Sequence, residues 1–178
     1  MKTLLMVCLI VCAGGVPTAT AADRTGVLII AGKDSHSWGA HEFHAGAKLL
    51  AKALNDSGLP VYAEVVTDQW PQDSSVFDGV KSVVIYCDGQ DKHVLNGHAD
   101  DMVALAARGV GLVCLHYALE VNPGDMQNRF LDWLGGYFDP AWSVNPVWTP
   151  NGMKVARHPV TRGVKPIEIE DEWYYHIR

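Results

Sequence analysis

Four short apolar runs dominate the pattern of the chain, and they lie at 27–31, 61–66, 82–87 and 110–115. The runs are rich in valine and isoleucine and are mostly continuous, with few polar residues alternating between the apolar ones. Continuous runs of this length are typical of strands that are buried on both faces of a parallel sheet. We therefore expect four neighbouring strands that are covered by helices above and below.

Helical patterns alternate with these runs. Residues 41–55 place their apolar side chains on one face, as an amphipathic helix does. Similar stripes predict helices at 97–108 and 125–134, while residues 73–79 predict at most a short helix. The alternation of strand and helix predicts an α/β fold with a doubly wound, mostly parallel sheet.

The pattern changes after residue 136, where aromatic residues and prolines dominate. This composition predicts loops and short strands, and residues 164–169 form the last β-like stretch. The chain then ends on apolar and aromatic residues with no helix to close the sheet. We expect the sequence to be a C-terminally incomplete part of a longer protein.

The N-terminal segment has the three parts of a secretory signal peptide. Lys2 supplies the positive charge, residues 4–11 are apolar, and the small residues Ala19 and Ala21 mark a cleavage site. The apolar part is too short to span a bilayer. We therefore predict a signal peptide at 1–22, one domain at 23–178, no membrane span, and export to the periplasm or the cell exterior.

The net charge limits the classes of binding partner that we expect, and the cysteines limit the kinds of disulfide or metal site. The formal net charge is −6 at pH 7, and loss of Lys2 with the signal peptide makes it one unit more negative. An acidic chain argues against a nucleic-acid partner, because basic surfaces supply most of that affinity. Cys87 and Cys114 fall within predicted strands, so we expect core thiols rather than a disulfide or a zinc site.

Polar side chains gather where the predicted strands end. Ligands of open α/β sheets bind at the carboxyl ends of the strands, so these side chains are the candidates for function. We predict that His36, Asp88, Tyr117 and Trp173 contact substrate. The polar side chains that follow the first, third and fourth apolar runs are His36, His41, His44, Asp88, His116 and Tyr117.

A metal site is one interpretation of the histidines. His41 and His44 are three residues apart at a predicted helix start, so they can share a face. With His116, and with Glu172 or His176, they could hold a divalent ion such as zinc. The alternative is that the first two histidines decorate a helix start while His116 is a hydrogen-bonded core residue. The sequence does not decide between these alternatives, so the cofactor stays unknown.

Acid–base chemistry is a second interpretation. His116, Glu172 and His176 are candidate catalytic groups, because imidazoles and carboxylates with shifted pKa values move protons. The alternative for Glu172 is a solvated acidic turn or a salt bridge to an arginine. Trp173 belongs to an aromatic group that could stack on sugar rings or simply pack against the sheet.

Three long motifs resemble the ThuA-like, or trehalose-utilisation, family. They are GVGLVCLHYA at 109–118, FLDWLGG at 130–136, and HPVTRGV at 158–164 leading into DEWYYH at 171–176. The resemblance covers about residues 26–178. It implies a flavodoxin-like sheet, as in class I glutamine amidotransferases, and a small-molecule carbohydrate as partner.

The resemblance also bears on the reaction. Class I glutamine amidotransferases carry a cysteine at the turn after a central strand, whereas the sequence here has His116 and Tyr117. Glutamine hydrolysis is therefore not expected. The resemblance implies a hydrolase or isomerase in the catabolism of trehalose or a keto-disaccharide. The alternative is a non-catalytic sugar-binding module on the same fold, and the oligomeric state stays open.

Overall fold

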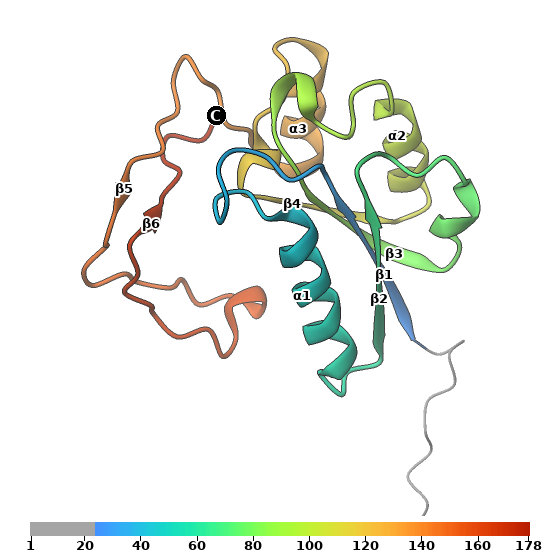
Figure 1. Ribbon diagram of the computed structural model, residues 1–178, viewed down its shortest axis with the longest axis horizontal. Coiled ribbons are helices and arrows are strands. Elements are labelled where there is room, and N and C mark those ends of the chain that lie inside the picture. The colour runs from blue at the N-terminus through green and yellow to red at the C-terminus, as the bar shows by residue number, and fades with distance from the viewer. Residues whose placement is uncertain (1–23) are drawn as a thin grey trace, which may run out of the picture.

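A computed structural model describes residues 24–178 and is shown in Figure 1. Four strands form one parallel sheet in the order β2-β1-β3-β4. The chain leaves the central β1 for β2 on one side and then returns to β3 on the other, so the winding direction reverses between β1 and β3. The α/β prediction is confirmed. The strands are β1 (Thr25–Ala31), β2 (Val61–Thr67), β3 (Val80–Tyr86) and β4 (Gly111–Leu115).

Three helices cover the sheet, and they are α1 (Phe43–Asp56), α2 (Ala99–Ala107) and α3 (Asp125–Leu134). Helix α1 lies on one face, and α2 and α3 lie on the other (Figure 1). Successive side chains of a strand point to opposite faces. In β1, Ile29 packs in the core on the α1 side, and Leu28 packs in the core that contains side chains of α2 and α3. Because both faces of β1 are covered, its sequence is apolar without alternation.

Short 3₁₀ helices follow two of the strands at the carboxyl edge. They are η3 (Gln90–Lys92) after β3 and η4 (His116–Leu119) after β4. Another, η2 (Ser74–Phe77), confirms the short helix that was expected before β3. The tight turns at η3 and η4 keep the polar residues of both segments close to the edge of the sheet.

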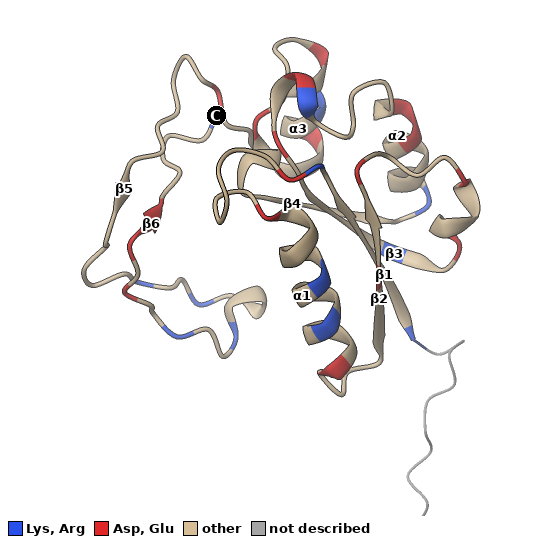
Figure 2. Ribbon diagram, viewed as in Figure 1, with Lys and Arg blue, Asp and Glu red and all other residues tan. Residues whose placement is uncertain are grey.

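The C-terminal segment forms an extended arm beside the sheet, with a two-stranded antiparallel pair of β5 (Val147–Trp148) and β6 (Asp171–Glu172). The expectation of a strand at 164–169 is wrong, because this stretch has no strand partner and contains Pro166, which lacks a backbone N–H to donate. A further 3₁₀ helix, η5 (Pro159–Thr161), precedes it. Figure 2 shows that lysines and arginines gather on this part of the arm.

The end of the arm returns to the body of the molecule. Val144 and Tyr175 form an antiparallel bridge, and the backbones of Tyr137 and Arg178 exchange two hydrogen bonds of 3.0 Å. These contacts place β6 and Tyr174 beside the carboxyl edge of the sheet. The arm therefore contributes side chains to the same region as η3 and η4.

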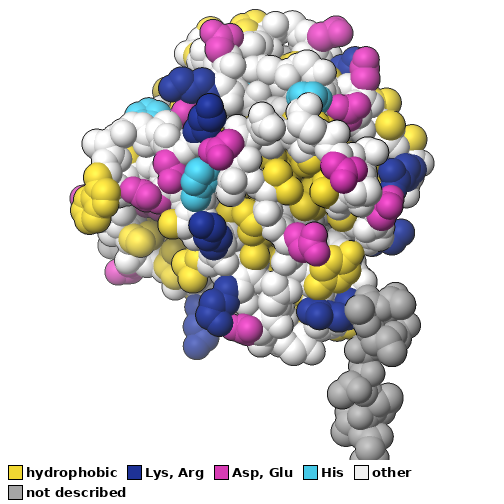
Figure 3. All heavy atoms as spheres, turned by 45° about the vertical axis from the view of Figure 1, so that its right-hand side comes forward, with side chains coloured by type: hydrophobic (Ala, Val, Ile, Leu, Met, Phe, Trp, Pro, Cys, Tyr) yellow, Lys and Arg dark blue, Asp and Glu magenta, His cyan; other side chains and the backbone are white. Residues whose placement is uncertain are grey.

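On the face of the molecule that Figure 3 shows, acidic side chains alternate with basic and hydrophobic ones. Cys87 and Cys114 are free thiols. In residues 24–178, no helix combines the length and apolar character needed to cross a bilayer. The predicted signal peptide at 1–22 lies outside the described residues.

Candidate functional site

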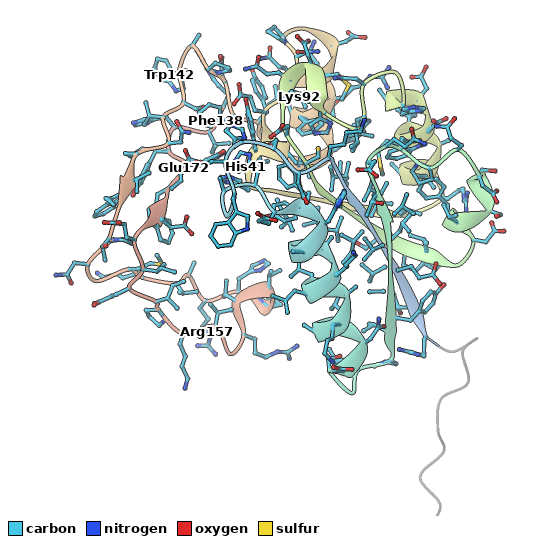
Figure 4. All side chains as sticks on the ribbon, viewed as in Figure 1. His41, Lys92, Phe138, Trp142, Arg157 and Glu172 are labelled. Atoms are coloured by element: carbon cyan, nitrogen blue, oxygen red, sulfur yellow. The ribbon has the colours of Figure 1, made fainter. Side chains whose placement is uncertain are left out.

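Histidines and carboxylates from four segments meet above the carboxyl ends of β1, β3 and β4. Figure 4 shows His41 near Glu172 and Phe138, which come from the C-terminal third of the chain. All three residues line one cavity of about 400 Å³. The cavity lies at the carboxyl edge of the sheet, between the loops after β1 and β4 and the arm, and this edge is the usual ligand position in open α/β sheets.

His116 begins η4 and has a left-handed backbone, with a φ of 53°. This conformation is rare for residues other than glycine and occurs often at functional sites. Nε2 of His116 lies 3.2 Å from Nε2 of His41, and the two rings are nearly perpendicular at 85°. One nitrogen must donate and the other accept, so the pair shares a single proton at this contact.

Asp88 determines which nitrogen donates. Its carboxylate is 4% exposed and lies 3.1 Å from Nδ1 of His41, and it accepts a 2.8 Å hydrogen bond from Ser35 Oγ. Since an ionised carboxylate only accepts, His41 carries its proton on Nδ1. Nε2 of His41 then accepts the hydrogen bond from Nε2–H of His116. In neutral His116, the unprotonated nitrogen is consequently Nδ1.

Glu172 approaches the same nitrogen of His116 as His41 does. Its Oε2 is 3.6 Å from His116 Nε2, and its Oε1 accepts a 2.8 Å hydrogen bond from Asn145. Burial lowers the pKa of His116, the charge of Glu172 opposes this shift, and His41 adds to it. His116 is therefore neutral at pH 7 and able to accept a proton, with a carboxylate nearby to stabilise the resulting cation.

A second grouping in the same place has the chemistry of a metal site. His36, His41 and Asp88 each offer a ligand atom, and these atoms lie within 4.8 Å of one another. Imidazole and carboxylate ligands suit zinc, and catalytic zinc sites use three protein ligands with one open position. The donor set fits such an ion. Metal binding would compete with the His41–Asp88 hydrogen bond.

The structure brings together most of the predicted site residues. Six of them share the carboxyl edge, and the remaining three lie elsewhere. Hydrogen bonds and short distances connect His116 to His41 and Glu172, and each of the other five lines one of two cavities at this edge. The six residues are His36, His41, Asp88, His116, Tyr117 and Glu172.

His44, Trp173 and His176 have other surroundings. His44 lies in α1 and contacts Asp68 at 2.9 Å and Asp34 at 3.6 Å. Trp173 donates from Nε1 to the carbonyl of Trp148 at 3.0 Å. His176 is exposed, and its carbonyl accepts a 2.8 Å hydrogen bond from Ser143 Oγ.

The sequence analysis missed Ser35, Glu120 and Tyr174. Ser35 joins His36, His41 and Asp88 through its hydroxyl. Glu120 follows η4 and is 6% exposed in the wall of the cavity. Glu120 lies four residues after His116 at the same carboxyl edge, and this position could have identified it as a site residue from the sequence. Burial and the charge of Glu172 raise the pKa of Tyr174, whose ring centroid lies 5.3 Å from that of His116.

A larger cavity of about 610 Å³ lies on the arm, around Arg157 and Arg162. It contains none of the predicted site residues. The smaller cavity beside His116 is the better functional candidate, because several titratable groups converge there.

Comparison with known proteins agrees with the sequence resemblance. A family model described as ThuA, trehalose utilisation, matches residues 26–178. No curated protein and no solved structure matches the chain.

Proposed function

The chain belongs to the ThuA, or trehalose-utilisation, family, and from this premise we propose that it is an enzyme of carbohydrate catabolism that acts on trehalose or a keto-disaccharide. The observation that carries the proposal is the hydrogen-bonded series Asp88–His41–His116, which ends beside Glu172 at a cavity of about 400 Å³. Such a series orients an imidazole and tunes its proton affinity.

Each residue has a defined role in this proposal. Asp88 holds His41 in the tautomer that accepts from His116, and His116 takes a proton at Nδ1, from the sugar in isomerisation or from the attacking water in hydrolysis. Glu172 stabilises the imidazolium that forms, and the same proton can return to a leaving oxygen. Both hydrolysis and isomerisation of a sugar need this kind of proton transfer, so the arrangement supports either reaction class.

A divalent metal could occupy the same site in place of the His41–Asp88 hydrogen bond. His36, His41 and Asp88 would hold it, as their donor types and mutual distances allow. When bound, the ion supplies a Lewis acid that polarises a carbonyl or hydroxyl oxygen of the sugar.

Glutamine hydrolysis is not part of the proposal. The turn after β4 has Tyr117 where amidotransferase-like proteins carry the nucleophile, and burial raises the pKa of Cys87 to about 12. Burial also raises the pKa of Cys114. A thiol with a raised pKa holds little thiolate at neutral pH.

The test is turnover by the purified protein, with and without added zinc. Trehalose and a keto derivative of it are incubated with the wild type, H116Q and H158Q, and products are followed by NMR. We expect turnover by the wild type and by H158Q, whose histidine is exposed on the arm, and a loss of at least about a hundredfold for H116Q. Sugar binding without turnover in the wild type would favour the non-catalytic module instead.

Export belongs to the proposal as well. It is supported by the charged, apolar and small-residue parts of segment 1–22. Expression of the full sequence with N-terminal sequencing tests it, and we expect the product to begin at Ala22 or Asp23. Recovery of an uncleaved product starting at Met1 would contradict export through a cleaved signal.

A further inference from the structure

We infer that the cavity beside His116 is a subsite for a neutral, unphosphorylated pyranose ring, and that Glu120 binds ring hydroxyls there and excludes anionic sugars. The inference rests on the proposed function in taking the ligand to be a carbohydrate. It goes further by assigning a place for the ring, a residue that recognises it, and a charge that the ligand must not carry.

The backbone of Glu120 is held firmly from three sides. Its N–H donates to the carbonyl of Tyr117 at 3.0 Å, its carbonyl accepts from the N–H of Gln90 at 2.9 Å, and it forms a parallel bridge with Phe138. Glu120 thus connects η4, η3 and the segment that leads to the arm. A side chain on such a rigid support is suited to positioning a ligand.

One oxygen of the Glu120 carboxylate is left for a ligand. Oε1 accepts a hydrogen bond from Gln90 Nε2, and Oε2 has no hydrogen-bond partner within residues 24–178. No fully buried side-chain nitrogen or oxygen in that part of the chain lacks a partner. Oε2 is therefore not fully buried, and because Glu120 lines the cavity, we place this oxygen at the cavity wall, where it can accept a hydrogen bond from a hydroxyl.

Aromatic rings form another wall of the same cavity. The ring centroids of Phe138 and Tyr174 lie 4.9 Å apart, and Tyr117 also lines the space. Pyranose rings present an apolar C–H face and a rim of hydroxyl groups. A cavity with aromatic faces and carboxylate and amide groups, here those of Glu120, Glu172 and Asn145, matches both features.

The charge of the cavity determines which sugars fit. Glu120 and Glu172 both line it, and no lysine or arginine does so among the described residues. The two carboxylates also contribute to raising the pKa of Tyr117, after burial. In the metal-free protein, a uronate or phosphate in this cavity would face two like charges, which repel it. A neutral ring meets no such repulsion.

Calorimetric titration of the full chain tests the inference, with trehalose, glucuronate and glucose 6-phosphate as probes. We expect the wild type to bind trehalose at least about tenfold more tightly than either anion. In E120Q, which keeps the shape but removes the charge, trehalose affinity falls several-fold and the preference over glucuronate shrinks to about threefold or less. E168Q, an equal change of charge on an exposed arm residue, keeps the wild-type preference.

A second variant covers the case in which E120Q does not fold. E120D keeps the charge but withdraws the carboxylate from the ring, so trehalose affinity falls while the discrimination against anions persists. Wild-type affinity and selectivity in a folded E120Q or E120D, or no binding of trehalose by the wild type, would overturn the inference.

The outcomes separate this inference from the proposed function. If turnover is found, E120Q raises KM with little change in kcat, whereas H116Q lowers kcat. Selective trehalose binding without turnover would support the subsite and reject the enzyme. Turnover with no effect of the Glu120 variants on KM or selectivity would support the enzyme and reject the subsite.

Discussion

The Nε2 atoms of His41 and His116 lie 3.2 Å apart although 75 residues separate the two positions in the chain. His41 is in turn held by Asp88, and His116 lies next to Glu172. This relationship links loops after β1, β3 and β4 to the C-terminal arm. The protonation of His116 therefore depends on residues of the loop after β1 and of the C-terminal arm.

The first prediction concerns that protonation. Burial lowers the pKa of His116, and the neighbouring His41 lowers it further. We expect NMR titration of the His116 ring to give a midpoint below the ordinary 6.5, and H41Q to move it upward, because glutamine cannot gain the positive charge with which a protonated His41 opposes protonation of His116. A midpoint that stays unchanged in H41Q would mean that the two rings are not coupled. E172Q should move the midpoint down.

The second prediction concerns zinc. H41Q and D88N each remove one ligand of the candidate metal site, so zinc affinity measured by competition with a chromogenic chelator should fall at least about tenfold. H44Q is the matched control, because His44 lies three residues from His41 but contacts Asp34 and Asp68 instead. Equal losses in H41Q and H44Q would contradict a site built on His36, His41 and Asp88.

The third prediction concerns stability at acid pH. His93 is 3% exposed, donates from Nε2 to the carbonyl of Ala118 at 3.0 Å, and has a pKa that burial lowers to about 4. Between about pH 6.5 and pH 4 the unfolded chain binds a proton at His93 and the native chain does not. The free energy of unfolding therefore falls as the pH drops through this window, by at most about 3 kcal/mol, and levels off below it.

Urea unfolding at several pH values measures this loss. His93 Nδ1 also accepts a 3.1 Å hydrogen bond from the N–H of Leu95. H93Q can keep both hydrogen bonds but does not titrate, so its unfolding free energy should fall less between pH 6.5 and pH 4 than that of the wild type. H158Q, which removes an exposed histidine, should behave as the wild type does. Parallel pH curves for H93Q and the wild type would contradict the assignment.

The fourth prediction concerns the thiols. Burial raises the pKa values of both Cys87 and Cys114, so neither holds much thiolate at neutral pH. We expect an aromatic disulfide reagent at neutral pH to label native protein at these positions at least about a hundredfold more slowly than protein unfolded in urea. Fast labelling of native Cys114 would contradict this prediction and would make Cys114 a candidate nucleophile.

The fifth prediction concerns Gly89. A Cβ at this position would lie 2.5 Å from the carbonyl oxygen of Glu120 and 2.8 Å from that of Tyr117. G89A should therefore push η3 away from η4, destabilise the protein by about 1–3 kcal/mol, and weaken binding at the cavity. G111A is the control, because the φ of Gly111 is not positive and its Cβ would meet only the carbonyl oxygen of Lys81 at 3.7 Å, an ordinary contact. Thermal unfolding of both variants measures the difference.

Local patterns predicted the elements of the fold well, because burial leaves a direct trace in the sequence. Leu28 and Ile29 are adjacent and both buried, as expected for a strand with two covered faces. The stretch at 164–169 carries apolar residues as well, but no neighbouring strand pairs with it. Apolar content alone did not distinguish a strand from an extended arm.

The spacing of His41 and His44 shows the limit of local patterns at the site. Three residues in a helix would bring the two side chains together, but α1 begins only at Phe43. His41 belongs to the preceding loop, where it bridges to Ser35. The loop directs its ring toward Asp88 and His116, whereas His44 follows the helix toward Asp34 and Asp68.

By itself, the sequence determined the strands, the helices, their α/β alternation and the family, since each depends on short-range periodicity or on contiguous motifs. The tertiary structure decided which polar groups meet. The strand order β2-β1-β3-β4 and the return of the arm bring His41, His116 and Glu172 within hydrogen-bonding range of one another or close to it. No local pattern contains that information, because distances between separate segments depend on how the whole chain packs.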